Sequence, residues 1–396
     1  MRATPDALVV GGGAFGLSAA RALRARGRSV TLVDAGAVPH PRASSTDISK
    51  IVRMDYGSDA FYARLAESAL AGWRAWNDLQ ERPLFHDTGF ALFAAAPMAP
   101  GGFEYESRRV LAELGHEVQR VDAVGIARRF PAWAPDAWAD GYVNTNAGWA
   151  ESGRAVAWLA DRARSEGVDI LERTPVVDLV DGSTPGLRLA DGSVLRAGTV
   201  VVAAGAWTAT LVPELDGVLR PVGQAVFHLR PDDPEPFRQE RFPTWGGDIA
   251  STGWYGFPVT ADGIVKVANH GSGLPVDPRN DVQVPPSFDG QLRAFLADKL
   301  PALADAPVVS RRLCLYCDTA DADFWIDRHP DRPGVLVMAG GSGHGFKFMP
   351  VLGDVVADIL DGVENPWAHR FRWRDPSRRK EHARFAGDPF AEAGTG

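Results

Sequence analysis

The sequence predicts a mixed α/β (α+β) fold of two domains. Near each end of the chain, at 6–26 and at 335–361, a short apolar strand leads into a glycine-rich turn and then a helix. The segment 220–310 instead alternates short strand-like runs with many Pro and Gly residues, which favours a second, largely antiparallel sheet. The length of 396 residues agrees with two domains of about 100–200 residues each.

The first glycine turn has the pattern of a dinucleotide cradle. A continuously apolar strand at 6–11 precedes Gly11, Gly13 and Gly16, which fit G-x-G-x-x-G, and a helix is expected over 17–26. Such a turn lets the backbone approach a pyrophosphate at a helix N-terminus. Asp34 ends the next strand, 21 residues after Gly13, where a carboxylate accepts from ribose hydroxyls. The sequence therefore predicts a Rossmann-like unit that binds either NAD or FAD.

The middle of the chain supplies the other expected elements. Apolar spacing predicts a helix over 58–79, and residues 84–94 are expected to form one strand. The segment 97–148 is rich in loops, with short helices near 105–115 and 122–130. Further expected elements are a helix from 151 to about 166, a strand at 168–171, three or four strands over 175–203, a helix at 287–299 and a strand at 308–317.

The second glycine turn favours FAD over NAD. Residues 340–345 lie between a buried strand at 335–339 and a helix expected over 350–361. A nicotinamide enzyme needs one such cradle, whereas a large flavin needs contacts from distant parts of the chain. Lys347 follows this turn, so its ammonium could lie over the isoalloxazine edge or hold a substrate carboxylate. The alternative is a solvated surface lysine.

Composition and charge exclude other classes. The net charge of −8 argues against a nucleic-acid binder, which needs a basic face. No apolar run approaches the ~20 residues that cross a bilayer, and residues 1–6 carry no secretory signal, so we expect a cytoplasmic protein without a membrane span. The polar segment 365–396 is expected to be peripheral.

Lysine is rare in this chain. Only five of the 42 cationic side chains are lysines, at Lys50, Lys266, Lys299, Lys347 and Lys380. Either composition bias left them at random, or the chain keeps lysine where a compact ammonium is needed.

Several motifs in fixed order resemble one enzyme family. They are residues 44–53 (SSTDISKIVR), 254–258 (WYGFP), Lys266 with His270, 312–316 (RLCLY) and 343–347 (GHGFK). Together they are similar to the monomeric sarcosine oxidase and fructosyl amino acid oxidase (amadoriase) family of FAD-dependent amine oxidases, in the D-amino-acid-oxidase superfamily. The resemblance extends from about residue 6 to about 360.

The resemblance implies a discontinuous architecture. A Rossmann-like FAD-binding domain of the glutathione-reductase type would take 1–82, 149–219 and 311–364. A substrate domain with a mixed, largely antiparallel sheet would take 83–148 and 220–310. The active site would lie between the two domains, where concave sites tend to form.

The resemblance also implies the cofactor-binding residues. Gly11, Gly13, Gly16 and Asp34 would bind the ADP half of FAD, Ser44, Ser45 and Ser49 would contact the diphosphate and flavin, and Val176 or Val177 would meet the adenine. Cys314 matches the cysteine that carries a covalent thioether to the flavin. The remaining expected contacts are Ala14, Phe15, Lys50, Ala204, Gly205, Trp207, Gly341, Gly343, His344, Gly345, Phe346 and Lys347.

The implied reaction is oxidation of a C–N bond in a small amine to an imine, with O₂ reduced to H₂O₂ by a monomeric enzyme. Arg53 and Lys347 would hold the substrate carboxylate, and Tyr255 and His270 would line the pocket. Lys266 would activate O₂, because a fixed cation stabilises developing superoxide.

Two departures point away from sarcosine itself. Lys50, also counted among the catalytic candidates, stands where sarcosine oxidases have an arginine and amadoriases a lysine, and Gly341 replaces a phenylalanine near the flavin and the substrate. These changes favour a larger secondary amine, N-alkyl or N-fructosyl. The alternatives are an amine dehydrogenase or tailoring oxidase acting on a cyclic or primary amine, and a flavoprotein that has lost catalysis.

Other polar residues receive no role. Cys317 is an extra cysteine that we interpret as a simple thiol rather than part of a metal or redox pair. His86, His228 and His329 show no ligand spacing, so no metal site is expected.

Overall fold

The computed structural model describes residues 4–375. One of its two large sheets has six strands in the order β20-β21-β13-β1-β2-β9, all parallel except the edge strand β20. Their bounds are β1 Ala7–Val10, β2 Val30–Val33, β9 Asp169–Leu171, β13 Thr199–Val202, β20 Trp325–Arg328 and β21 Val335–Ala339. The expected strand at 335–339 is confirmed to the residue.

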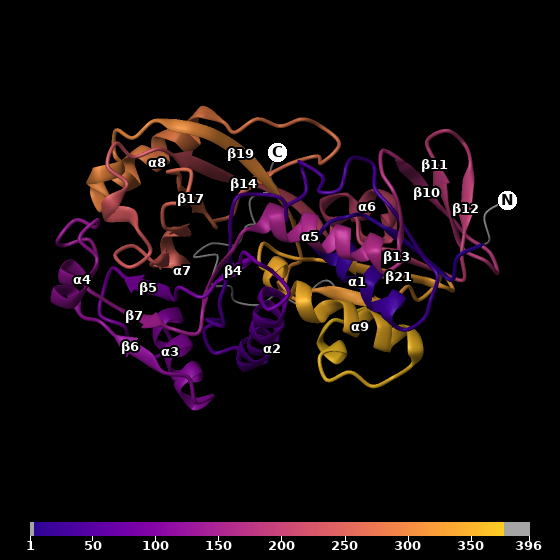
Figure 1. Cartoon of the computed structure of the whole chain (residues 1–396), viewed down its shortest axis with the longest axis horizontal. Helices are drawn as coiled ribbons and strands as arrows, with labels where there is room; N and C mark the ends of the chain where they lie inside the picture. Colours follow the sequence, from indigo (N-terminus) through magenta and orange to yellow (C-terminus); the bar gives the residue numbers. More distant parts are fainter. Residues whose placement is uncertain (1–3, 376–396) are drawn as a thin grey trace.

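Both faces of this sheet are covered. Val9, Val201 and Leu336 pack toward helices, whereas Val200 and Val202 pack toward the opposite side, as the period-two alternation of a strand requires. The helices are α1 Ala14–Ala25, α2 Ala60–Asn77, α5 Ser152–Ser165 and α9 Met349–Asp361; the other side carries β10 Val176–Val180, β11 Gly186–Leu189, β12 Val194–Arg196 and α6 Thr208–Leu211. In Figure 1, α1, α5 and α9 lie with β13 and β21 in the right half of the molecule.

The other large sheet has nine strands and is mixed, with β5 and β15 its parallel pair. Its path runs β18-β14-β17-β16-β15-β5-β7-β6, and β19 pairs with β14. The bounds are β5 Phe90–Ala94, β6 Val118–Arg120, β7 Asp140–Asn144, β14 Arg220–Leu229, β15 Thr244–Gly247, β16 Trp254–Gly256, β17 Val265–Asn269, β18 Leu274–Pro275 and β19 Val308–Asp318. The mixed α/β fold with a largely antiparallel second sheet is thus confirmed.

Shorter elements complete the fold. Helices α3 Phe103–Glu113, α4 Ala123–Arg129, α7 Ile249–Thr252 and α8 Pro286–Lys299 accompany the nine-stranded sheet in the left half of Figure 1. A small antiparallel sheet joins β3 Lys50–Val52 and β4 Phe85–His86 to β8 Gly148–Ala150.

Two expectations need correction, and the domain division stays a prediction that we refine. Residues 84–94 form two strands rather than one, because Gly89 adopts φ +82° between them, a conformation that breaks a strand. The strands at 118–120 and 140–144 were not expected, since such short runs carry little periodic signal. The domain boundaries at 149 and 311 fall inside β8 and β19, so we propose to place them at the ends of those strands.

The segment after residue 364 is not peripheral throughout. Phe371 is fully buried, and Arg370 forms ion pairs with Asp59 at 2.6 Å and Asp323 at 2.9 Å. Residues 365–375 therefore pack on the domain of the six-stranded sheet. The rest of the expected tail, 376–396, and Lys380 with it, lies outside the described residues.

Helices α1 and α9, which are far apart in the sequence, approach each other closely. The Ser18 hydroxyl donates to the Met349 carbonyl at 2.6 Å. A Cβ added to Gly353 would lie 2.2 Å from the Ser18 carbonyl oxygen, closer than any real contact. Glycine at residue 353 is therefore required by the distance between the helices.

We expect Gly353→Ala to lower the free energy of unfolding by ~1–3 kcal/mol, because the methyl group forces the helices apart. The measurement is the urea denaturation midpoint. Gly290→Ala is the matched control: this α8 glycine has open space around its Cα, so alanine there should be neutral or stabilise by up to ~1 kcal/mol. Equal effects of the two substitutions would contradict the argument.

Candidate active site

A cleft lies where three parallel strands end. β1, β13 and β21 are neighbours, so the segments that follow them, beginning at Gly11, Ala203 and Gly340, meet at one edge of the sheet. The enclosed space is about 380 Å³, within the range of small-molecule sites. This edge is the usual ligand position in doubly wound sheets.

Glycines shape the floor of the cleft. Gly11 has φ +102°, and a Cβ there would lie 2.5 Å from the Ala203 carbonyl oxygen, while one on Gly16 would lie 1.8 Å from that of Gly11. These two glycines let the turn close tightly. Gly13 and Gly341 differ, because the nearest atoms to their added Cβ are 3.4 and 3.7 Å away. A ligand can therefore approach the backbone here, and this open cradle fits a dinucleotide.

Asp34 closes one end of the cleft. Its Oδ2 accepts from the Gly12 amide at 2.7 Å and its Oδ1 from the Gly36 amide at 2.8 Å. The carboxylate is thereby fixed at the end of β2, next to the glycine turn, with lone pairs left for ribose hydroxyls.

Most of the sequence-predicted cofactor residues line this cleft: Gly11, Gly13, Ala14, Phe15, Asp34, Ser44, Ser45, Lys50, Val176, Ala204, Gly205, Trp207, Gly341, Gly343, Gly345 and Phe346. Of the two adenine-side candidates, Val176 lines the cleft and Val177 is exposed. His344 does not line it, since its ring bonds Tyr56 and the Ala322 carbonyl. Ser49 and Cys314 are fully buried behind the wall, and the Ser49 hydroxyl has no hydrogen-bond partner among residues 4–375.

Two lysines and one carboxylate lie close together beneath the residues that line the cleft. Lys266 is fully buried, and its Nζ lies 2.6 Å from Asp47 Oδ2. Lys50 Nζ lies 3.9 Å from the same oxygen and 3.5 Å from Cys314 Sγ. Lys50, rather than Lys266, thus presents its side chain to the cleft. Arg312 of β19 holds the loop above by donating to the carbonyls of Ala43 and Thr46.

Arg53 and Lys347 gather around Tyr56. The Lys347 ammonium donates to the Tyr56 hydroxyl at 2.9 Å and to the His344 carbonyl at 3.0 Å. The Arg53 guanidinium lies 5.5 Å from the Tyr56 ring centre, and its Nη1 is buried without a hydrogen-bond partner in the described part of the chain. Burial, and then the charge of Arg53, hold the pKa of Lys347 well below its usual value. The Asp55 carboxylate opposes this shift and also interacts with Arg53, but it forms no ion pair with either cation among the described residues.

The aromatic side chains of Tyr255, His270 and Tyr316 form a second group. The His270 ring lies 6.3 Å from that of Tyr255 and 5.7 Å from that of Tyr316, centre to centre. A Cβ on Gly343 would meet Tyr316 at 2.2 Å and His270 at 2.7 Å. The glycine turn thus brings Tyr255 and His270 close to the cleft, which Tyr316 lines.

The sequence analysis missed several residues of this region. His40, Arg42 and Tyr316 line the cleft, and Tyr56 bonds Lys347. His228, to which no role was given, lies 3.2 Å from Asp47. Two of these residues had an available signal: Tyr316 ends the quoted motif 312–316, and Tyr56 follows the motif 44–53 by three residues.

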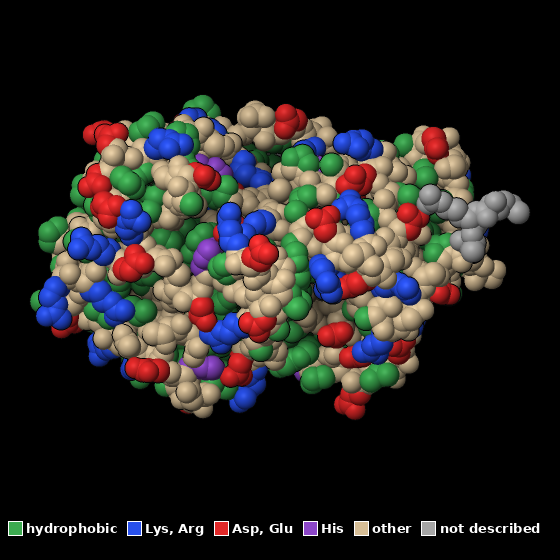
Figure 2. Space-filling model, viewed as in Figure 1, with side chains coloured by type: hydrophobic (Ala, Val, Ile, Leu, Met, Phe, Trp, Pro, Cys, Tyr) green, Lys and Arg blue, Asp and Glu red, His purple; other side chains and the backbone are tan. Residues whose placement is uncertain are grey.

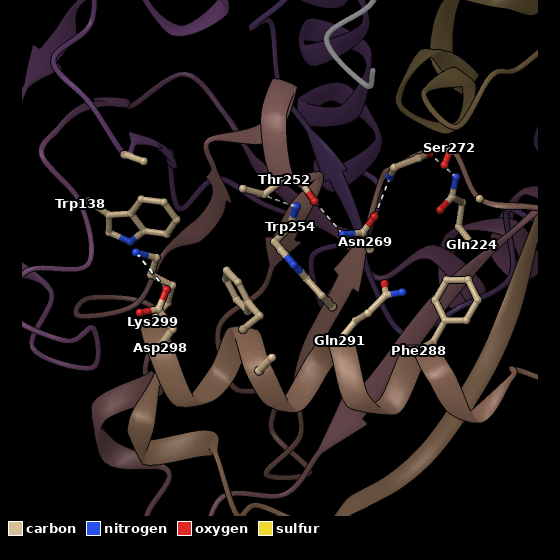
Figure 3. A pocket seen from close by; sticks show the side chains of 15 residues that line it. Trp138, Gln224, Thr252, Trp254, Asn269, Ser272, Phe288, Gln291, Asp298 and Lys299 are labelled. Carbon is tan, nitrogen blue, oxygen red and sulfur yellow. Dashed lines mark hydrogen bonds and ion pairs between the residues drawn. The ribbon is translucent and has the colours of Figure 1, made fainter. Parts of the chain in front are cut away.

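A second hollow, of about 740 Å³, contains none of the predicted site residues. It lies between α8 and the loop after β17, and Trp254, Asn269 and Gln291 line it (Figure 3). The adjacent residues Tyr255 and His270 belong instead to the aromatic group at the cleft. Successive strand side chains point to opposite faces, so this hollow lies on the other side of the sheet.

Two further features concern the charges on the surface and the character of the helices. On the face shown in Figure 2, acidic and basic side chains are interspersed, and neither sign forms a continuous patch. Among residues 4–375, no helix has both the length and the apolar character needed to cross a bilayer.

Comparison with known proteins assigns a family. A family model of FAD-dependent oxidoreductases matches residues 6–359. The chain is 28% identical over 360 residues to a monomeric sarcosine oxidase from Bacillus sp. (strain B-0618), covering 89% of this chain and 91% of that one. It is 29% identical over 363 residues to an N-methyl-L-tryptophan oxidase from Salmonella heidelberg (strain SL476), covering 90% and 95%.

A solved structure with a similar fold belongs to a related enzyme. The structure of a deglycating fructosamine oxidase, amadoriase II from Aspergillus fumigatus, superposes with a TM-score of 0.84 at 26% identity, covering 98% of this chain and 94% of that one.

Proposed function

The chain belongs to the family of FAD-dependent oxidoreductases, and on that premise we propose that it oxidises a secondary amino acid, N-alkyl or N-fructosyl, and passes the electrons to O₂. An amine oxidoreductase that uses FAD agrees with the named relatives. The substrate class and the formation of H₂O₂ are the parts that we propose.

The unpaired cations Arg53 and Lys347 are the observation that carries this proposal. A buried guanidinium nitrogen without a partner costs free energy, and a substrate carboxylate would supply the missing acceptor. Bidentate binding of a carboxylate is the interaction that arginine favours. With the carboxylate held there, the Cα–N bond would be oriented by the same two side chains.

The space at Gly341 supports a bulky N-substituent. The nearest atom to a Cβ at Gly341 is 3.7 Å away, on Phe15, so this wall of the cleft is open. Lys50, at a position where amadoriases also have a lysine, likewise favours a substrate with a bulky N-substituent. FAD, when bound, would supply the electron acceptor: the amine would lose a hydride from carbon and a proton from nitrogen, and the two electrons and two protons would reduce O₂ to H₂O₂. The substrate would leave as an imine that water hydrolyses.

An oxidase assay tests the proposal directly. Purified protein is mixed with sarcosine, N-methyltryptophan, pipecolate or fructosyl-valine, and H₂O₂ is measured. We expect turnover of fructosyl-valine or N-methyltryptophan to exceed that of sarcosine. Turnover with a dye acceptor but not with O₂, or of pipecolate alone, would instead support a dehydrogenase or a tailoring oxidase. No reaction with any amine, in protein that holds flavin, would reject the proposal.

Carboxylate binding should depend on pH through Lys347. Burial and the charge of Arg53 lower the pKa of Lys347, and a bound anion would raise it again. Binding therefore takes up a proton, and the affinity for acetate should fall by up to ~tenfold per pH unit as pH rises between the free and bound pKa. The measurement is acetate titration of the flavin absorbance. Lys347→Met should abolish the pH slope, and a slope that persists in this variant would contradict the mechanism.

Lys266 is proposed to assist the reaction with O₂, because a fixed positive charge stabilises charge that develops on oxygen. We expect Lys266→Met to slow reoxidation of the reduced protein by ~10²-fold or more while reduction by amine changes less. Stopped-flow measurement of the two half-reactions checks this. Equal losses in both would rule out the role.

We further propose that FAD is attached through Cys314. Its sulfur lies beside Lys50 and 3.6 Å from the Ser44 carbonyl, and both of these residues line the cleft. Acid precipitation should leave the yellow colour on the protein, and Cys314→Ala should release it, whereas Cys317→Ala should not. Full release of the colour from the unmodified protein would refute the attachment.

Finally, we propose that the protein works as a monomer in the cytoplasm. Neither cysteine forms a disulfide, as in a reducing compartment, and a sarcosine oxidase named as monomeric covers most of the chain.

A further inference from the structure

Asp47 joins two neighbouring strands through one buried carboxylate. Its Oδ2 lies 2.6 Å from Lys266 Nζ, and its Oδ1 lies 3.2 Å from His228 Nε2. His228 on β14 and Lys266 on β17 are directly opposite in the antiparallel register, so their side chains leave the same face of the sheet. Both carboxylate oxygens are engaged, which fixes the orientation of the group.

The charges around Asp47 are unequal. Lys266 is fully buried and also donates to the Ser49 carbonyl at 2.6 Å. A second ammonium, that of Lys50 on β3, lies 3.9 Å from Asp47 Oδ2. One carboxylate therefore faces two ammonium groups.

The other groups near this cluster do not neutralise the excess positive charge. Cys314 on β19 contacts Lys50, and the buried hydroxyl of Tyr255 on β16 has a pKa raised by burial. Phe257 offers Lys266 only its ring face, at 4.7 Å. Asp47 is thus the counterion on which the charge of Lys266 depends.

A buried ammonium without a counterion loses its proton. Burial, together with the charge of Lys50, lowers the pKa of Lys266 to about 8, although Asp47 opposes the shift. Burial alone would raise the pKa of Asp47, but Lys266 and His228 outweigh it and hold that pKa well below its usual value. The pair is therefore ionised at neutral pH only because both members are present.

We propose that Asp47 is a positioning residue that keeps Lys266 protonated and fixes its Nζ, and that His228 holds the carboxylate in place. This proposal rests on the proposed function in one respect only: the positive charge of Lys266 would be used in the reaction with O₂. Neither Asp47 nor His228 contacts the reacting atoms in this scheme.

Because lysine is rare in this chain, the ionisation of Lys266 can be measured by NMR. The chain contains five lysines, so the holoprotein labelled with [ε-¹³C]lysine gives few NMR signals, and Lys266→Met identifies that of Lys266. We expect the Lys266 signal to titrate near pH 8. In Asp47→Asn the midpoint should fall by about one pH unit or more, since the buried charge loses its partner.

Two further variants complete the test. Asp289→Asn removes a carboxylate on α8 that pairs with Arg311 and should leave the Lys266 midpoint unchanged. Lys50→Met removes the competing ammonium and should raise it. If Asp47→Asn does not fold, Lys50→Met decides alone, and no rise in the midpoint overturns the proposal.

Two other results would also overturn it. One is an unchanged midpoint in folded Asp47→Asn, and the other is an ordinary midpoint near ~10.4 in the unmodified protein. The titration needs neither amine nor O₂, so its failure would leave the proposed oxidase activity intact. Conversely, inactivity on every amine would leave the titration result standing.

Discussion

The parallel pairing of three strands determines where the rest of the molecule lies. β1, β13 and β21 are neighbours in one sheet, and parallel strands all end at the same edge. The turns after them therefore meet, although they begin at residues 11, 203 and 340. The close contact of α1 and α9 keeps these two helices, far apart in the sequence, together on one face of this sheet. A cleft built in this way can enclose a long cofactor from several sides.

Buried charge organises the region between the two large sheets. Asp47 is engaged by Lys266 and His228, and another buried carboxylate, Asp55, accepts from Tyr142 and Asn144. Arg53 and Lys347 thus retain positive charge that no carboxylate contact in the described residues balances, and a buried unpaired charge is costly. Such a site favours an anionic ligand. The same charge pattern separates the region proposed for the substrate carboxylate from the one proposed for oxygen chemistry.

The four lysines that the structure describes lie in different surroundings. Lys266 and Lys347 are buried and donate to the backbone carbonyls of Ser49 and His344, and Lys50 lines the cleft. Lys299 instead lies over the Trp138 ring on the other face of the nine-stranded sheet. A compact ammonium suits such carbonyl sites better than a planar guanidinium. Lysine is therefore concentrated at the candidate site, as one of the two interpretations of its rarity predicted.

The sequence by itself determined the two glycine turns, their flanking strands and helices, and Asp34, because a tight turn, a positive φ and a helix start are local properties of the chain. The sequence also indicated about half of the residues that line the cleft. Only the tertiary structure decided that Val176 rather than Val177 faces it, that His344 points elsewhere, that Phe371 is buried and that Asp47 and His228 stand behind Lys266. These features depend on strand register and on partners for buried charges that lie far apart in the chain. Local periodicity carries no information about either.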